Sequence, residues 1–125
     1  MILDTNALSA LAEGDVAAAA KLGEARQVAV PVIVLGEYLF GIAHSRRRHE
    51  FERWLRELVS TVRVLDVNEE TAARYAGART ELKQSGTPIP SNDVWIAALC
   101  RQHALPLLSR DRHFDLIKGL ERVSW

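Results

Sequence analysis

The apolar residues of this chain fall into short runs that alternate with longer segments of helical periodicity. Each short run ends at a polar or turn-forming residue, a pattern typical of buried strands in an α/β protein. The predicted strands are residues 2–3, 27–30, 62–65, 105–109 and, at the end of the sequence, 123–125.

The segments between these runs carry apolar residues at spacings of three and four, which predicts amphipathic helices. The clearest case is 46–59, where Phe51, Leu55 and Leu58 share one face and charged residues fill the rest. The predicted helices are residues 7–13, 16–25, 33–44, 46–59, 69–84, 93–103 and 111–117.

Polar residues precede three of these helices and can cap them. Asn6 precedes the first helix, and Asn68, which two glutamates follow, precedes the fifth. Before the sixth helix, either Ser91 or Asn92 can take this role. The helix starts are therefore predicted from local side-chain chemistry.

Strands and helices alternate over the whole sequence, which indicates an α/β domain. Parallel strands need crossover connections of a dozen or more residues, so we expect a central, mostly parallel sheet of about five strands flanked by helices. A chain of 125 residues is long enough for one core and too short for two ordinary domains. Residues 1–125 are therefore predicted to form a single domain.

Composition excludes several classes of protein. The chain is 48% apolar and 26% charged, which is ordinary for a globular protein, and its 16 basic and 16 acidic residues cancel. The single cysteine, Cys100, can form no internal disulfide. Pro31, Gly36 and Glu37 interrupt the longest apolar stretch, so we expect no membrane span, and with no signal peptide a cytoplasmic location.

Four acidic residues stand among apolar neighbours or at the end of an apolar run, where an ionised carboxylate is costly. Taken singly, each has an ordinary explanation as a turn acid or a helix-start acid. Together they indicate a shared site, because the ends of neighbouring strands lie about 5 Å apart. The four are Asp4, Glu37, Asp93 and Asp111. Asp66 also follows a predicted strand, but a turn before Asn68 explains it better.

Carboxylates gathered this closely raise one another's pKa unless a cation compensates them. The four histidines, at positions 44, 49, 103 and 113, show no metal-ligand spacing, which argues against zinc. An all-oxygen site suits Mg²⁺ or Mn²⁺ instead, and such a site activates water and stabilises charge on a phosphoryl group. Whether one or two ions bind stays open at this point.

Three short motifs and one glutamate resemble a known family. The motifs are residues 4–6 (DTN) after the first strand, residues 92–98 (NDVWIAA) at the start of a late helix, and residues 109–114 (SRDRHF) after the next strand. With Glu37 in the helix after the second strand, they resemble the PIN domain, and more narrowly the VapC toxins of bacterial and archaeal toxin–antitoxin pairs. The resemblance covers nearly the whole chain.

The resemblance implies a three-layer PIN-like fold and a metal-dependent endoribonuclease toxin that cleaves RNA with metal-activated water. It also implies a cognate antitoxin protein and a homodimer. Asp115 competes with Asp111 for the fourth acidic position, and Asp111 ranks first. By this resemblance the catalytic acids are Asp4, Glu37, Asp93 and Asp111, the metal ligands Asp4, Asp93 and Asp111, and the accessory residues Thr5, Asn6, Asn92, Ser109 and Asp115.

Basic residues are candidates for RNA contact. Arg110, Arg112 and His113 flank Asp111 and can hold a phosphate near the metal. Arg46 and Arg47, on the basic face of the fourth predicted helix, either grip an RNA backbone or belong to a solvated surface.

Two rival functions fit the same residues. Asp4 follows a strand, where the nucleophile of an aspartate-based phosphoryl-transfer enzyme belongs, although the companion acid two residues later is Asn6 here. The other rival is a non-catalytic module that keeps the fold and binds RNA or a protein. A covalent intermediate at Asp4, or the absence of a metal site, would separate these from the nuclease.

Overall fold

Five short strands form a parallel sheet at the centre of the molecule. They are β1 (Ile2–Leu3), β2 (Ala29–Pro31), β3 (Arg63–Leu65), β4 (Leu107–Leu108) and β5 (Arg122–Val123), in a computed structural model that describes residues 1–125. Their order across the sheet is β3-β2-β1-β4-β5, and every neighbouring pair is parallel. The predicted parallel sheet is confirmed. The last strand is shorter than predicted and excludes Trp125, because only Arg122 and Val123 pair with β4.

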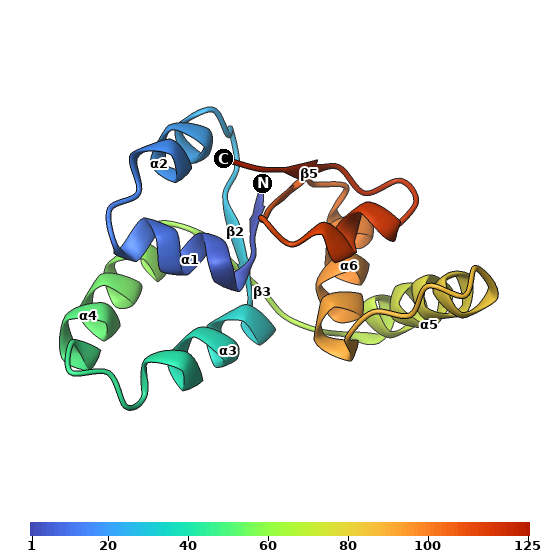
Figure 1. The fold of residues 1–125 in the computed structure, drawn as a ribbon, viewed down its shortest axis with the longest axis horizontal. Helices are drawn as coiled ribbons and strands as arrows, with labels where there is room; N and C mark the ends of the chain where they lie inside the picture. Colours follow the sequence, from blue (N-terminus) through green and yellow to red (C-terminus); the bar gives the residue numbers. More distant parts are fainter.

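Six α-helices and one 3-10 helix cover the two faces of this sheet. They are α1 (Thr5–Ala12), α2 (Val16–Gly23), α3 (Val32–Ile42), α4 (Arg48–Val59), α5 (Glu69–Gln84), α6 (Ser91–His103) and the 3-10 helix η1 (Arg112–Leu116). Figure 1 shows α1 to α4 on one side of the strands and α5 and α6 on the other. Right-handed crossovers explain the division, because the chain runs from β1 to β3 in one direction and then reverses to β4 and β5.

The reversal lies between β1 and β4, at the middle of the sheet. Leu3 and Leu108 pair in register, and the Asp4 backbone N–H donates to the Leu108 carbonyl at 3.2 Å. The residues that follow the two strands, Asp4 and Ser109, therefore leave the sheet side by side. In open α/β sheets this point, beyond the carboxyl ends of the strands, is where ligands bind.

The first helix begins two residues closer to the strand than predicted. Asp4 has an extended backbone, and its side chain accepts the Thr5 N–H as the N-cap of α1. The prediction that Asn6 caps this helix is wrong, because Asn6 already lies within the first turn. The amide of Asn6 is thereby left available for other contacts.

The sixth helix also begins earlier than predicted. α6 starts at Ser91 and its N-cap position is Pro90, which makes no side-chain cap, so neither Ser91 nor Asn92 caps it. Pro90 holds an extended conformation that lets the helix begin directly after it. The prediction for α5 is confirmed, since Asn68 and Thr71 form a reciprocal capping box.

α6 passes through the hydrophobic core, which fixes the position of its first turn. Ile96, Ala97 and Leu99 are fully buried in the same cluster as the side chains of β1 and β4. Cys100 is buried as well, and burial raises the pKa of its thiol to about 12, which makes it a packing residue. None of the helices combines the length and the apolar character needed to cross a membrane.

Candidate active site

The carboxylate of Asp4 is the most deeply buried acidic group of the candidate site. Asp4 is the one acidic residue in the buried class, with 5% of its surface exposed. Its Oδ1 accepts the Thr5 backbone N–H at 2.8 Å, while Oδ2 accepts the Ser109 hydroxyl at 2.6 Å and the Asn6 amide at 3.1 Å. All of these donors stabilise the ionised form of the carboxylate.

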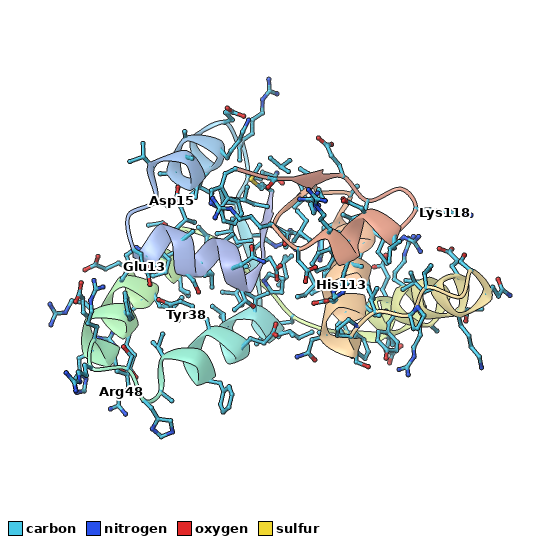
Figure 2. The ribbon with its side chains drawn as sticks, in the orientation of Figure 1. Glu13, Asp15, Tyr38, Arg48, His113 and Lys118 are labelled. Carbon is cyan, nitrogen blue, oxygen red and sulfur yellow. The ribbon has the colours of Figure 1, made fainter.

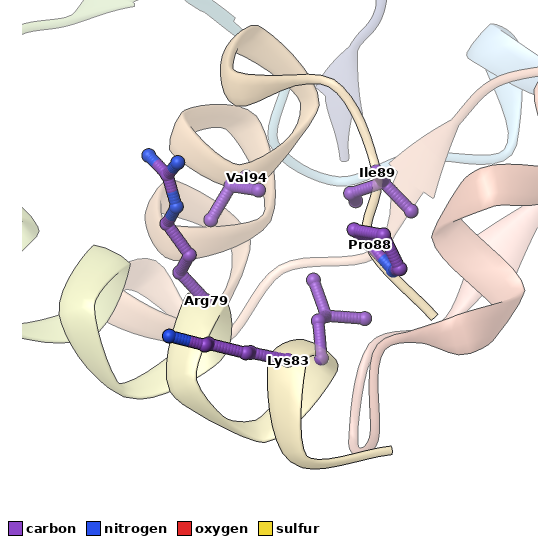
Figure 3. A pocket seen from close by; sticks show the side chains of 6 residues that line it. Arg79, Lys83, Pro88, Ile89 and Val94 are labelled. Atoms are coloured by element: carbon purple, nitrogen blue, oxygen red, sulfur yellow. The ribbon is translucent and has the colours of Figure 1, made fainter. Parts of the chain in front are cut away.

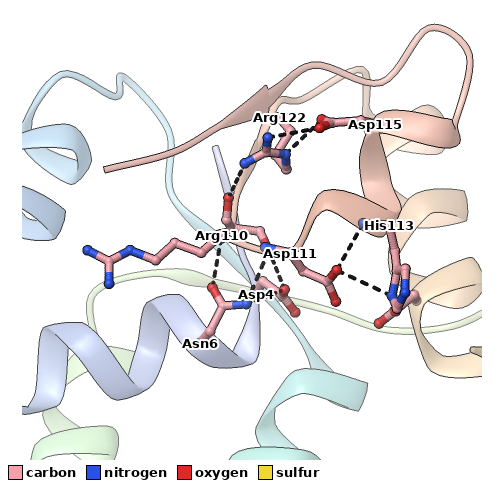
Figure 4. Close-up of polar contacts among 9 residues, drawn as sticks. Asp4, Asn6, Arg110, Asp111, His113, Asp115 and Arg122 are labelled. Atoms are coloured by element: carbon pink, nitrogen blue, oxygen red, sulfur yellow. Dashed lines mark hydrogen bonds and ion pairs between the residues drawn. The ribbon is translucent and has the colours of Figure 1, made fainter.

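The hydroxyl of Ser109 links Asp4 to Asp111. Ser109 is fully buried, and its Oγ accepts the Asp111 backbone N–H at 2.9 Å and the Asn6 amide at 3.2 Å. The other end of the Asn6 amide accepts the Arg110 backbone N–H at 3.1 Å. Figure 4 shows this network joining the end of β1 to the end of β4. Two residues predicted to be accessory, Asn6 and Ser109, are therefore built into the site.

Asp93 and Asp111 come together with His113 beside this network. One ligand atom from each of the three lies within 4.8 Å of the others. The His113 Nδ1 is 3.3 Å from the Asp93 Oδ2 and 3.3 Å from the Asp111 Oδ1. Asp111 also caps η1 by accepting the His113 backbone N–H at 2.9 Å. Asp4 lies outside this group of three.

The pKa values of Asp93 and Asp4 are raised by burial first and by neighbouring negative charges second. Burial raises the pKa of Asp93 to about 6, and the charges of Asp111 and Asp4 add to the rise. Burial also raises the pKa of Asp4, and the charges of Glu37 and Asp111 act in the same direction, against the hydrogen bond from Ser109. A bound cation would remove much of this cost, because it favours the ionised form of every carboxylate near it.

Glu37 is connected to the site through Thr5. The Thr5 hydroxyl donates to the Glu37 Oε1 at 3.2 Å, which ties α3 to the start of α1. Glu37 lies in α3, which begins directly after β2, the strand that neighbours β1. The fold thus brings Asp4 and Glu37 to the same side of the molecule as Asp93 and Asp111, beyond the carboxyl ends of the strands.

Asp115, the rival for the fourth acidic position, lies outside the acidic group. Its carboxylate accepts two hydrogen bonds from the Arg122 guanidinium, at 2.7 and 2.9 Å, and these lower the pKa of Asp115. Arg122 also donates to the Ser109 carbonyl at 3.0 Å. Asp115 therefore ties η1 to β5, whereas Asp111 shares its group with Asp93. No sequence pattern pointed to Arg122, because its contacts depend on β5 lying beside β4.

Three residues expected at the site, Arg110, Asn92 and Arg112, make no side-chain hydrogen bond to its four acids. The Arg110 guanidinium lies 4.5 Å from the centre of the Trp125 ring and donates to the Trp125 carbonyl at 3.3 Å, so it holds the end of the chain. Asn92, one of the predicted accessory residues, is exposed in the first turn of α6 and makes no hydrogen bond to the four acids. Arg112 is exposed.

The arginines at the start of α4 lie away from the acids. Arg47 donates to Glu50 at 2.8 Å and covers the Phe51 ring at 4.5 Å, and Arg46 is exposed in the preceding turn. Figure 2 shows Arg48, the next residue, at the outer end of α4, far from His113. Arg46 and Arg47 therefore belong to a solvated surface, the second of the two alternatives for these residues, and do not adjoin the acids of the site.

A hollow of about 390 Å³ lies between α5 and the segment that leads into α6. It is lined by two basic residues, Arg79 and Lys83, with apolar side chains around them (Figure 3). Because no carboxylate lines this hollow, it is not a cation site. The candidate active site is therefore the group of carboxylates beyond the carboxyl ends of β1 and β4.

A family model and solved structures match this chain and its fold. The model of the PIN domain matches residues 1–120, and the chain belongs to the PIN domain family. The resemblance to VapC proteins is confirmed as well. Ribonuclease VapC5 from Mycobacterium tuberculosis is 30% identical over 99 residues, which cover 78% of this chain and 73% of the relative.

Solved structures add the likeness in three dimensions. The structure of VapBC2 from Rickettsia felis, bound to a DNA fragment from its promoter, has a TM-score of 0.88 and covers 99% of this chain and 97% of its own. Its sequence identity is 24%, so this likeness shows the fold alone. A toxin-antitoxin complex from Klebsiella pneumoniae has a TM-score of 0.77 at 27% identity, covering 95% of this chain and 93% of that one.

Proposed function

We propose that this chain is a metal-dependent endoribonuclease of the VapC type, a toxin that hydrolyses RNA phosphodiester bonds. One observation carries the proposal. The buried Asp4 is joined through Ser109 to Asp111, which lies beside Asp93, beyond the carboxyl ends of β1 and β4. Membership of the PIN domain family and the ribonuclease activity named for the VapC5 relative support it.

The donor chemistry of the site suits Mg²⁺ or Mn²⁺. Asp4, Asp93 and Asp111 offer carboxylate oxygens, the ligands that these hard cations prefer. Burial, together with the nearby charges, raises the pKa of Asp93 to about 6, and a divalent cation offsets this cost of ionisation. When bound, such an ion lowers the pKa of water and stabilises charge that develops on a phosphate.

The residues of this chain then divide the work. Ser109, Asn6 and the Thr5 N–H hold Asp4 ionised and fix its orientation. We assign to Glu37, which the Thr5 hydroxyl holds in place, the acceptance of a proton from the attacking water. The predicted products are a 5′-phosphate and a 3′-hydroxyl, and no protein nucleophile is required.

The geometry around Asp4 argues against a phosphoaspartate mechanism. Both carboxylate oxygens of Asp4 already accept hydrogen bonds, and only 5% of the surface of this residue is exposed. A nucleophile needs an oxygen that can approach phosphorus in line, and the burial of Asp4 restricts that approach, while Oδ1, which accepts one hydrogen bond, keeps a lone pair for a cation. Asp4 is better placed to supply fixed negative charge than to attack.

The proposal is tested by incubating the purified protein with total RNA and Mg²⁺ or Mn²⁺ and mapping the cut ends. Cleavage should disappear in EDTA and in the Asp4→Asn variant, because the substitution removes charge with almost no change of volume. Asp66→Asn is the matched control, since Asp66 also follows a strand but is exposed. Full activity of Asp4→Asn, or undiminished cleavage in EDTA, would refute the mechanism.

We also propose an antitoxin partner and a homodimer. The likeness to a toxin-antitoxin complex supports the partner, and so do exposed apolar side chains beside a groove of about 530 Å³ between α3 and α4. Leu39, which lines this groove, is 44% exposed, and Phe40, the next residue of α3, is 83% exposed. A neighbouring gene whose product binds the protein and stops cleavage is the expected finding, and light scattering should give the mass of a dimer.

A further inference from the structure

The group formed by Asp93, Asp111 and His113 contains a nitrogen donor, the imidazole of His113, which a site built from carboxylates alone would lack. We propose that His113 is itself a ligand of the cation, through Nδ1, and that this nitrogen makes the centre bind Mn²⁺ in preference to Mg²⁺. The inference rests on the proposed function, because that function supplies the metal site. It assigns to His113 a role different from the phosphate contact that the sequence suggested.

The first support is the geometry of the three donor atoms. The Nδ1 of His113 is equidistant, at 3.3 Å, from oxygens of Asp93 and Asp111, and the three donors fall within 4.8 Å of one another. Adjacent ligands of an octahedral ion, each about 2.1 Å from the metal, are about 3 Å apart. The imidazole therefore stands where a third ligand of the same ion would stand.

The second support is that the backbone which carries this imidazole is fixed. Asp111 accepts the His113 N–H at 2.9 Å, and the next residue, Phe114, is fully buried in the core. The His113 side chain is 51% exposed, so solvent ions reach the group without any rearrangement of the core. A ligand that is positioned before binding loses little conformational entropy when the metal arrives.

Ligand chemistry turns this position into a preference among metals. Mg²⁺ binds almost entirely through oxygen, whereas first-row transition ions accept imidazole nitrogen more readily. A centre of carboxylates plus one imidazole therefore favours Mn²⁺ more than a centre built from carboxylates alone.

An opposite role for His113 predicts an opposite result. A protonated imidazole at this position would neutralise Asp93 and Asp111, and a cation would have to displace it. Removal of the side chain would then strengthen metal binding. If His113 is a ligand, the same removal weakens it.

The deciding experiment is pulsed electron paramagnetic resonance of Mn²⁺ bound to the full-length protein. Direct coordination by His113 predicts electron-spin-echo modulation from a ¹⁴N nucleus in the wild type and its loss in His113→Ala. By calorimetry, His113→Ala should bind Mn²⁺ on the order of tenfold more weakly, with a change below about threefold for Mg²⁺. His49→Ala is the matched control, because His49 lies exposed on α4.

The outcomes separate this inference from the proposed function. Mn²⁺ that binds without ¹⁴N modulation overturns the role of His113 and leaves the metal-dependent nuclease intact. Equal or tighter Mn²⁺ binding by His113→Ala overturns it as well. Failure of the wild type to bind Mn²⁺ in a manner that depends on Asp93 and Asp111 overturns both.

Discussion

Replacement of Ser109 by alanine tests the network that holds the site together. The Ser109 Oγ donates to the Asp4 Oδ2 at 2.6 Å and accepts the Asp111 N–H at 2.9 Å and the Asn6 amide at 3.2 Å. The substitution removes all three contacts and leaves the backbone of β4 unchanged. It also separates the loop that carries Asp111 from Asp4.

The expected loss of stability follows from these contacts. A hydrogen bond to a charged acceptor contributes about 1.5–3 kcal/mol, and a neutral one about 1 kcal/mol. Asp4 keeps its bonds from Thr5 and Asn6, which limits the damage. We therefore expect Ser109→Ala to lower the free energy of unfolding of the metal-free protein by about 2–4 kcal/mol at pH 7. That is a large part of the about 5–15 kcal/mol typical of a small domain.

The loss should depend on pH, with a definite sign. The pKa of Asp4 in the folded protein is raised above its ordinary value, and the Ser109 hydrogen bond opposes the rise. Without this bond the pKa of Asp4 in the folded protein rises further. The free energy of unfolding of the variant is therefore reduced most at high pH, where Asp4 is ionised. As the pH falls through the folded pKa of Asp4, the difference between wild type and variant should shrink.

Urea unfolding followed by circular dichroism, at pH 7 and pH 4.5 in EDTA, measures this difference. Ser124→Ala is the control, because Ser124 is exposed near the end of the chain. Calorimetry with Mn²⁺ should also show weaker binding by Ser109→Ala, since Asp111 loses its anchor. A variant within about 0.5 kcal/mol of the wild type at pH 7 would refute the reasoning, because surface substitutions alone have effects of that size.

Two further predictions concern the acids. Asp111→Asn should weaken Mn²⁺ binding at least about tenfold, whereas Asp115→Asn, which only loses its pairing with Arg122, should leave it unchanged in calorimetry; equal effects would contradict the assignment of Asp111. Because the pKa of Asp93 is raised from 3.8 to about 6, its ionisation destabilises the metal-free fold. Stability in urea should therefore rise as the pH falls from 7 to 5, and Asp93→Asn should remove this trend.

The candidate site was predictable in part because its acids violate local expectation. Asp4 follows an apolar strand and Glu37 stands on an apolar helix face, so each needs a compensating partner wherever the chain folds. Asp111 was likewise preferred to Asp115, and the ion pair of Asp115 with Arg122 explains why Asp115 is occupied elsewhere. Such reasoning identifies residues that need partners without naming those partners.

The helix caps show where local reasoning fails. Asn6 and Asp4 both have side chains that cap helices, and their intrinsic preferences are nearly equal. The choice fell to Asp4 because β1 ends at Leu3, which leaves Asp4 as the last extended residue. Asn6 was thereby freed to bridge Asp4 and Ser109.

The sequence by itself determined the alternation of strands and helices, the parallel sheet and the four acids, because hydrophobic periodicity and the cost of burying charge are local properties of the chain. Only the tertiary structure decided that Ser109 bridges Asp4 and Asp111, and that His113 joins Asp93. These contacts span up to 105 residues along the chain. They depend on the strand order, in which β4 returns to lie beside β1, and no spacing within the sequence encodes that return.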